Sequence, residues 1–210
     1  MNTNNQLEPA TVHIALDIDD VLHSTYSESF SHWKPLLDSG TWTAQDFHEA
    51  VREAYVKQIS DNLADECNVM PGYLLSHMPL LEAVLIRHPG ARVVIASDWR
   101  KSFQNLDKLC SLFSPAVAAR VVGKLSVDPG LDSMNSDAPN RRGYLMINWM
   151  AANVTADAPW LAVDDDQGHW GDHKEHLVRT QKLCGLNMQT ALELDQRIST
   201  LENALQFYSK

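Results

Sequence analysis

The sequence predicts an α/β fold in which a doubly wound parallel sheet has helices on both faces. The observation that leads to this prediction is that short apolar runs alternate with segments of helical periodicity. Two of these runs end in clusters of aspartate, and one long segment, residues 24–70, does not fit the alternation. Strands that alternate with helices pair in parallel through right-handed crossovers, which produces this architecture.

The apolar runs are predicted to be strands over residues 12–16, 91–96, 120–123, 160–163 and 176–179. The segments between and after them have helical patterns, which predict helices over residues 72–88, 102–112, 142–153 and 189–207. In open sheets of this kind, ligands bind outside the carboxyl ends of the strands. The residues that follow each strand are therefore the first candidates for a functional site.

Residues 24–70 separate the first predicted strand from the helix that leads into the second. Apolar residues recur there every four positions and form one face of a helix: Phe47, Val51, Tyr55, Ile59 and Leu63. We therefore predict a small helical cap insertion over the strand ends, set in a core that comprises residues 1–23 and 71–210. The alternative is that this segment packs against the side of the sheet.

Length and composition limit the classes of protein that fit the sequence. The chain has 210 residues, 44% of them apolar, which suits one domain with a sizeable core, with or without an insertion. No apolar run approaches the length of a membrane span, and the polar N-terminus is expected to be neither a signal peptide nor a basic transit peptide. Three widely spaced cysteines suit reduced thiols, so a cytoplasmic location is expected.

Two predicted strands end in acidic clusters, which are Asp17, Asp19 and Asp20 after the first and Asp164, Asp165 and Asp166 after the fourth. Parallel strands would bring both clusters to one edge of the sheet, where like charges raise each other's pKa and destabilise the fold. A divalent cation removes this cost, and ligands that are all oxygen suit Mg²⁺. The alternative is that several of these aspartates serve only in turns or as helix caps.

The second strand ends in Ser97, which is followed by Asp98, Trp99 and Arg100. A hydroxyl at this point would face the same crevice as the acidic clusters. A serine after a strand is also a common helix N-cap, so Ser97 alone is weak evidence for a site.

These motifs resemble those of the haloacid-dehalogenase-like (HAD) superfamily of phosphohydrolases. The resemblance rests on three strand-end motifs in the family's order: Asp17-Ile-Asp19-Asp20-Val21, Val93-Val-Ile-Ala-Ser97 and Trp160-Leu-Ala-Val-Asp164-Asp165. A closer resemblance, to the small HAD-like domains of bacterial proteins and of multidomain RNA-repair proteins, rests on Ser97-Asp-Trp-Arg100, Ser114-Pro, Arg120-Val-Val-Gly123, Arg142 to Trp149, Leu177-Val-Arg-Thr and Gly185-Leu-Asn. It extends to about residue 197 and leaves out the insertion.

The resemblance implies a Rossmannoid core and a Mg²⁺-dependent phosphatase mechanism. Asp17 would attack phosphorus and form an aspartyl-phosphate. Asp19 would protonate the leaving oxygen and then activate water, and the presence of this second aspartate favours phosphate chemistry over dehalogenation. Ser97 would bind a phosphoryl oxygen. The metal would be held by Asp17, by the backbone carbonyl of Asp19, and by Asp164 or Asp165.

The family also implies a lysine or arginine beside the phosphoryl group, and three residues compete for this role. Lys124 follows the third predicted strand, while Arg141 and Arg142 open the helix before the fourth. We prefer Arg142, because it lies seven residues before Trp149 as in the small-domain pattern. The alternative for each is a solvated surface cation. Asp98, Trp99 and Arg100 are predicted to contact the substrate.

A histidine-rich loop follows the fourth strand and contains His169, His173 and His176. The spacing of His169 and His173 could bind a transition metal if the loop is helical. We expect instead a polar loop that lines the mouth of the site.

The sequence thus predicts a phosphatase that acts on a small phosphorylated metabolite or nucleotide. With 17 basic and 27 acidic residues, a net charge of −10 makes nucleic acid the less favoured partner, and no membrane partner is expected. Two alternatives stay open: a nucleic-acid end-processing phosphatase, and a non-catalytic phosphoryl-binding or regulatory module. The presence of both Asp17 and Asp19 argues against the second alternative.

Overall fold

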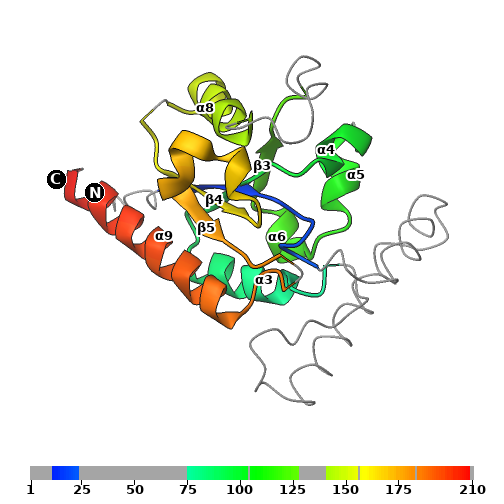
Figure 1. Ribbon diagram of the computed structural model, residues 1–210. Helices are drawn as coiled ribbons and strands as arrows, with labels where there is room; N and C mark the ends of the chain where they lie inside the picture. The colour runs from blue at the N-terminus through cyan, green and yellow to red at the C-terminus, as the bar shows by residue number, and fades with distance from the viewer. Residues whose placement is uncertain are drawn as a thin grey trace, which may run out of the picture.

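The computed structural model describes residues 11–23, 75–103, 105–127, 141–155, 157–182 and 184–208. Within these ranges it contains a five-stranded parallel sheet of order β3-β2-β1-β4-β5 (Figure 1). The strands are β1 His13–Leu16, β2 Arg92–Ile95, β3 Val121–Lys124, β4 Trp160–Asp164 and β5 Leu177–Arg179. The α/β fold and its strands are confirmed, whereas the predicted cap over residues 24–70 lies outside the described residues.

Strand β1 lies at the centre of the sheet, and its apolar side chains contribute to both faces. Leu16 pairs with Ile95 of β2 and with Val163 of β4, so the three strands end at the same level. Alternate residues along each strand point to opposite faces. Ile14 and Leu16 accordingly belong to one apolar cluster, and Ala15 belongs to the other.

Helices α3 (Met78–Arg87) and α9 (Met188–Tyr208) pack against each other on one face of the sheet (Figure 1). The short helix α6 (Pro115–Ala118) packs against α3 on the same side. The other face is covered by α8 (Arg141–Asn153) and by two 3-10 turns, η1 (Gln167–His169) and η2 (Gly171–His176). Helices and 3-10 turns therefore cover both faces of the sheet, as expected for a doubly wound fold.

The single helix expected over residues 102–112 is wrong. The chain forms α4 (Trp99–Ser102) and α5 (Leu106–Cys110) with a break between them. The break follows from Asn105, which is extended and whose side chain accepts a hydrogen bond from the backbone of Asp107, as an N-cap does. An asparagine that caps one helix cannot continue the helix before it.

The cysteines differ from expectation at one position. Cys110 carries a free thiol, but Cys184 is disulfide-bonded, so the expectation of reduced thiols is wrong for Cys184. Among the residues that the structure describes, no helix is both long and apolar enough to cross a membrane.

Candidate active site

The carboxyl ends of β1 and β4 bring acidic residues from both clusters together. Asp17 follows β1 directly, and its backbone N–H donates to the carbonyl of Val163 at 3.0 Å. Asp164 is the last residue of β4. Carboxylate oxygens of Asp17, Asp164 and Asp165 lie within 4.8 Å of one another. The parallel register thus produces the cluster that the strand ends predict.

Arg142 lies in the first turn of α8 and points into this cluster. Its Nη1 donates to Asp17 Oδ2 at 2.6 Å and also to Asp164 Oδ2. All three side chains are at least 95% buried. Burial alone would lower the pKa of Arg142, but the charges of Asp17 and Asp164 hold it above its usual value. The two carboxylates and the guanidinium therefore form one buried charged unit.

Further donors fix the carboxylate orientations. The indole Nε1 of Trp170, a fully buried side chain, donates to Asp164 Oδ2 at 2.8 Å. The backbone N–H of Asp166 donates to Asp164 Oδ1 at 2.9 Å. For Asp17, the backbone N–H of Ile18 donates to Oδ1 at 2.8 Å. These hydrogen bonds hold each carboxylate in one rotamer, and a site that binds a ligand in a single geometry requires such fixed side chains.

Burial and mutual repulsion make the charged forms of the clustered carboxylates unfavourable, and a bound cation would reduce this cost. Burial and the Asp17 charge raise the pKa of Asp164 to about 7, although Arg142 opposes the shift. Burial, together with the charges of Asp17 and Asp20, raises the pKa of Asp165 to about 6. Arg142 therefore leaves part of the negative charge uncompensated. The all-oxygen donor set and this residual charge fit a hard divalent cation such as Mg²⁺.

Asp19 has a different environment from Asp17. From Ile18 the chain forms a tight turn, in which Leu22 N donates to the carbonyl of Ile18 at 2.8 Å. Asp19 is partly exposed, and its carboxylate pairs with His23 Nε2 at 3.1 Å. It also accepts hydrogen bonds from the indole Nε1 of Trp99 at 3.0 and 3.1 Å. The carboxylate of Asp17 is thus buried against Arg142, whereas that of Asp19 is partly exposed and contacts His23 and Trp99.

The segment that follows β2 forms a second polar network. Arg100 is fully buried and donates to the carbonyl of Ser97 at 3.0 Å and to Asp98 Oδ1 at 2.8 Å. Arg141 Nη2 donates to the same Asp98 oxygen at 3.1 Å, which joins α4 to α8. Burial would raise the pKa of Asp98, but Lys101, Arg100 and Arg141 hold it far below its usual range. This network positions the loop that carries Ser97 and Trp99.

Ser97 is itself fully buried, and its Oγ accepts a hydrogen bond from Trp99 N at 3.3 Å. The N-cap residue of α4 is Asp98, so this bond is a local turn contact and not the helix cap that was considered as the alternative for Ser97. Its assignment as a phosphoryl ligand stays a prediction.

Lys124 and Arg142 occupy different environments. Lys124 Nζ donates to the backbone carbonyls of Phe103 at 2.8 Å and Arg100 at 3.3 Å, at the carboxyl end of α4. A cation there also interacts favourably with the helix dipole. Of the basic residues considered from sequence, it is Arg142 that contacts Asp17.

The aspartates and histidines after β4 separate into two groups. Asp166 accepts a hydrogen bond from Gly168 N at 2.7 Å and caps η1, so the capping alternative holds for this residue. His169 faces the acidic cluster, with Nε2 3.6 Å from Asp166 and Nδ1 4.0 Å from Asp164. His173 and His176 lie on η2 instead.

Sequence reasoning missed the hydrogen bonds of Trp99 and Trp170 and the contact of His23 with Asp19. Each of these side chains contacts a carboxylate that the motifs had identified, but the motifs do not say which carboxylate it is. Trp99 was expected at the site, but as a substrate contact. The available signal was an indole N–H within a few residues of a strand end, which is a donor that needs a partner when buried.

The chain was compared with models of known families, with curated proteins and with solved structures. The family model described as "HAD domain in Swiss Army Knife RNA repair proteins" matches residues 13–191 of the chain. The matched range contains all five described strands and the candidate site residues from Asp17 to His176. Neither the comparison with curated proteins nor that with solved structures finds a match.

Proposed function

Since the chain belongs to the family of HAD domains in Swiss Army Knife RNA repair proteins, we propose that it is a Mg²⁺-dependent phosphatase that forms an aspartyl-phosphate intermediate. Membership supports a HAD-type phosphohydrolase in general terms. The observation that carries the finer proposal is the contact of Arg142 with both Asp17 and Asp164. It places a fixed cation beside the carboxylate that the family motif identifies as the nucleophile.

In the proposed reaction, a carboxylate oxygen of Asp17 attacks phosphorus and the bond from phosphorus to the ester oxygen breaks. Asp19 gives its proton to the leaving oxygen, which departs as an alcohol. Asp19 then takes a proton from water, whose oxygen attacks the aspartyl-phosphate. The bond between Asp17 and phosphorus breaks, which releases inorganic phosphate, restores the Asp17 carboxylate and leaves Asp19 protonated for the next cycle.

Arg142 has two roles in this scheme. It holds Asp17 in one rotamer, and it stabilises the negative charge that accumulates on the phosphoryl oxygens. Its Nε is buried and has no hydrogen-bond partner among the described residues, so a donor is left for a bound phosphoryl oxygen. Removal of one such donor from a preorganised site typically slows a reaction by about 10²–10³-fold.

Asp17, Asp164 and Asp165 are the residues that would hold Mg²⁺, which when bound neutralises the charge between the nucleophile and the phosphoryl group. The hydrogen bonds that orient Asp164, from Trp170 and the backbone of Asp166, and Asp17, from the backbone of Ile18, support this assignment.

The test of this function uses hydrolysis of an aryl phosphate. The wild-type protein should release phosphate with Mg²⁺ and lose activity with EDTA. Asp17→Asn should be inactive, because an amide is not a competent nucleophile, while Asp19→Asn should be about 10²–10⁴-fold slower. Asp157→Asn, at an exposed aspartate outside the site, serves as the matched control. Near-normal turnover by Asp17→Asn would refute the covalent mechanism.

The rival class is a non-catalytic module that binds phosphoryl groups. Such a module would bind inorganic phosphate or a phosphate analogue with Mg²⁺ but would give no turnover with any phosphate ester. Trapping of a phosphorylated protein that depends on Asp17 would decide in favour of the enzyme.

For the substrate, we propose a small phosphorylated metabolite or nucleotide. A protein that binds a polynucleotide neutralises several phosphates with lysine and arginine, whereas this chain has a net charge of −10. The family's description favours a second candidate, an RNA end that carries a phosphate. Hydrolysis of nucleoside monophosphates, sugar phosphates and end-phosphorylated oligoribonucleotides should be compared directly. A marked preference for the oligonucleotide, with strongly salt-dependent binding, would exclude the small substrate.

The cytoplasmic location also stays a proposal. The disulfide bond at Cys184 counts against it, because structural disulfides are uncommon in that compartment. Alkylation of thiols at the moment of cell lysis, followed by mass spectrometry, would show whether Cys184 is reduced in the cell.

A further inference from the structure

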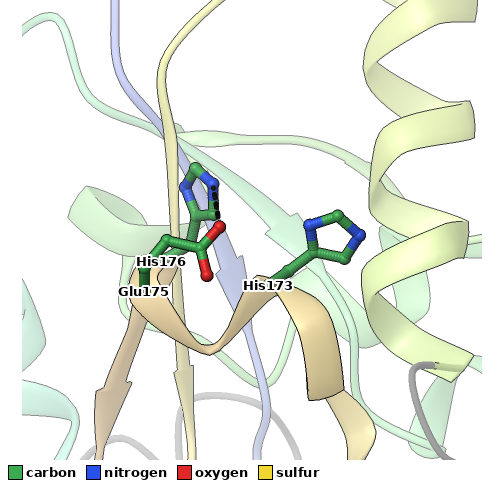
Figure 2. A group of neighbouring side chains, drawn as sticks. All are labelled: His173, Glu175 and His176. Atoms are coloured by element: carbon green, nitrogen blue, oxygen red, sulfur yellow. Dashed lines mark ion pairs between the residues drawn. The ribbon is translucent and has the colours of Figure 1, made fainter.

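A second group of possible metal ligands lies on η2, apart from the aspartate cluster. His173, Glu175 and His176 each offer a ligand atom, and these atoms lie within 4.8 Å of one another. Figure 2 shows that all three side chains come from the same short turn, with the Glu175 carboxylate between the two imidazole rings in that view. The imidazole rings of His173 and His176 lie near each other, with centroids 6.4 Å apart.

The tautomer of His176 is fixed by strand β4. Its Nδ1 lies 2.9 Å from the backbone carbonyl of Trp160, and a carbonyl oxygen can only accept, so Nδ1 carries the hydrogen. The ring also stacks on the Trp160 indole, with centroids 4.0 Å apart and an angle of 8° between the planes. Metal-binding histidines are typically held in this way, by a hydrogen bond from the nitrogen that does not bind the metal.

This arrangement leaves the other nitrogen of His176 facing a carboxylate. Nε2 lies 3.4 Å from Glu175 Oε1. In the neutral ring Nε2 bears a lone pair, so two acceptors face each other unless a cation lies between them or a proton is added. Ligand atoms around a tetrahedral zinc ion are about 3.3 Å apart, since Zn–N and Zn–O bonds are about 2.0–2.2 Å long. The observed separation is close to this value.

His173 is the third possible ligand and lies within η2. Its backbone departs from helical geometry, with φ −110° and ψ 19°, which marks a kink between two turns of η2. Its ring stands edge-on to Tyr144 of α8, with centroids 6.3 Å apart, and Cδ2 would lie 2.7 Å from a Cβ at position 143. The glycine at 143 therefore makes room for this ring beside α8.

We propose that His173, Glu175 and His176 bind a divalent transition-metal ion of the Zn²⁺ class, with water in the remaining position. Two imidazoles and one carboxylate suit such an ion better than Mg²⁺, which prefers oxygen ligands. The side chains of His176 and Glu175 are 33% and 63% exposed, so an ion can reach them from solvent. All three ligands lie on η2, so the ion would cross-link side chains within this turn, which directly follows Trp170.

The His169 and His173 spacing considered from sequence is not the pair that the structure favours. His169 faces Asp164 and Asp166 of the acidic cluster, as described above. His176, which lies three residues after His173, is the histidine that the fold turns toward Glu175. The two metal sites therefore have separate ligands, and each can be tested without the other.

The experiment is a calorimetric titration of Zn²⁺ into EDTA-treated, desalted full-length protein, with millimolar Mg²⁺ present to occupy the oxygen site. We expect one Zn²⁺ per chain. His173→Gln and His176→Gln should each weaken its affinity at least tenfold. His169→Gln, the same substitution on the neighbouring turn, is the matched control and should leave the affinity unchanged. Co²⁺ in place of Zn²⁺ should give a visible absorption spectrum that disappears in His176→Gln.

Three results would overturn the proposal. The first is an absence of Zn²⁺ binding in wild-type protein that has a normal circular dichroism spectrum. The second is Zn²⁺ binding that is lost in His169→Gln or Asp165→Asn and kept in His176→Gln, because the ion would then occupy the aspartate cluster. The third is equal binding in all the histidine variants. Thermal melts without metal show whether each variant is folded, so a loss of binding cannot come from unfolding.

Discussion

The indole Nε1 of Trp99 donates to both carboxylate oxygens of Asp19, at 3.0 and 3.1 Å. Trp99 is held in turn by Phe103, on which it stacks with centroids 5.9 Å apart and planes 13° from parallel. His23 pairs with the same carboxylate from the turn after β1. In the proposed mechanism Asp19 carries the proton, so Trp99 is a positioning residue for the general acid.

Trp99→Phe keeps a ring that can stack on Phe103 but removes the indole donor. We expect kcat to fall by about 10–100-fold, a fraction of the full value of general acid catalysis, with little change in KM. The loss should be larger for alkyl phosphates than for nitrophenyl phosphate, because a poor leaving group depends more on protonation. Trp149→Phe is the control, and an equal loss for both types of leaving group would exclude the positioning role.

Arg142→Ala should cost far more activity than Lys124→Ala. Arg142 contacts Asp17 and Asp164, so its removal should lower kcat/KM by about 10²–10³-fold. Lys124 donates to the backbone carbonyls of Arg100 and Phe103 at the end of α4, so its removal should mainly lower the unfolding temperature. Arg142→Lys should restore a part of the activity, since lysine keeps the charge but not the planar donor pair. If Lys124→Ala were the more damaging change in kcat/KM, the assignment of the phosphoryl-binding cation would be wrong.

His77 should make the stability of the fold depend on pH. Burial and the nearby His23 lower the pKa of His77 from 6.5 to about 4. The unfolded chain therefore binds a proton below pH 6.5 that the folded chain does not bind until about pH 4. Stability from this residue is complete above pH 6.5 and is lost as the pH falls toward 4, by about 3 kcal/mol.

The measurement for His77 is urea denaturation at several pH values between 7.5 and 4. His77→Gln should flatten the decline in unfolding free energy relative to wild type, although its stability at pH 7.5 should also be lower because the site is buried. His169→Gln is a control at a more exposed histidine. An identical decline in wild type and His77→Gln would show that other groups cause the pH dependence.

Gly185 should tolerate no larger side chain. Its φ is +62°, and a Cβ would lie 2.9 Å from the carbonyl of Val21 and 3.0 Å from the His77 ring. That carbonyl accepts a hydrogen bond from Leu186 N at 2.8 Å, so it cannot move away freely. Gly185→Ala should destabilise the fold by about 1–3 kcal/mol in urea denaturation. Gly168→Ala, where the nearest atom belongs to a surface side chain, should cost clearly less.

The sequence determined the strands and the acids that end them, because both signals are local. An apolar run of four or five residues that stops at an aspartate is visible without knowledge of its neighbours. Parallel pairing then places all strand ends at one edge, so Asp17 and Asp164 could be assigned to one site in advance. The break after α4 was also encoded locally, by Asn105, but it was overlooked because the apolar periodicity continues through it.

Only the tertiary structure decided which partners orient these acids. Arg142 contacts Asp17 across 125 residues of sequence, and Trp99 contacts Asp19 across 80. The spacing from Trp149 favoured Arg142 over Arg141 and Lys124, but the contact of Arg142 with Asp17 depends on the packing of α8 on the sheet. The same holds for the histidines after β4. The side chain of His169 lies beside the aspartates and that of His176 beside Glu175. The stacking of His176 on Trp160 and the backbone kink at His173 determine these orientations, and neither can be read from the sequence spacing.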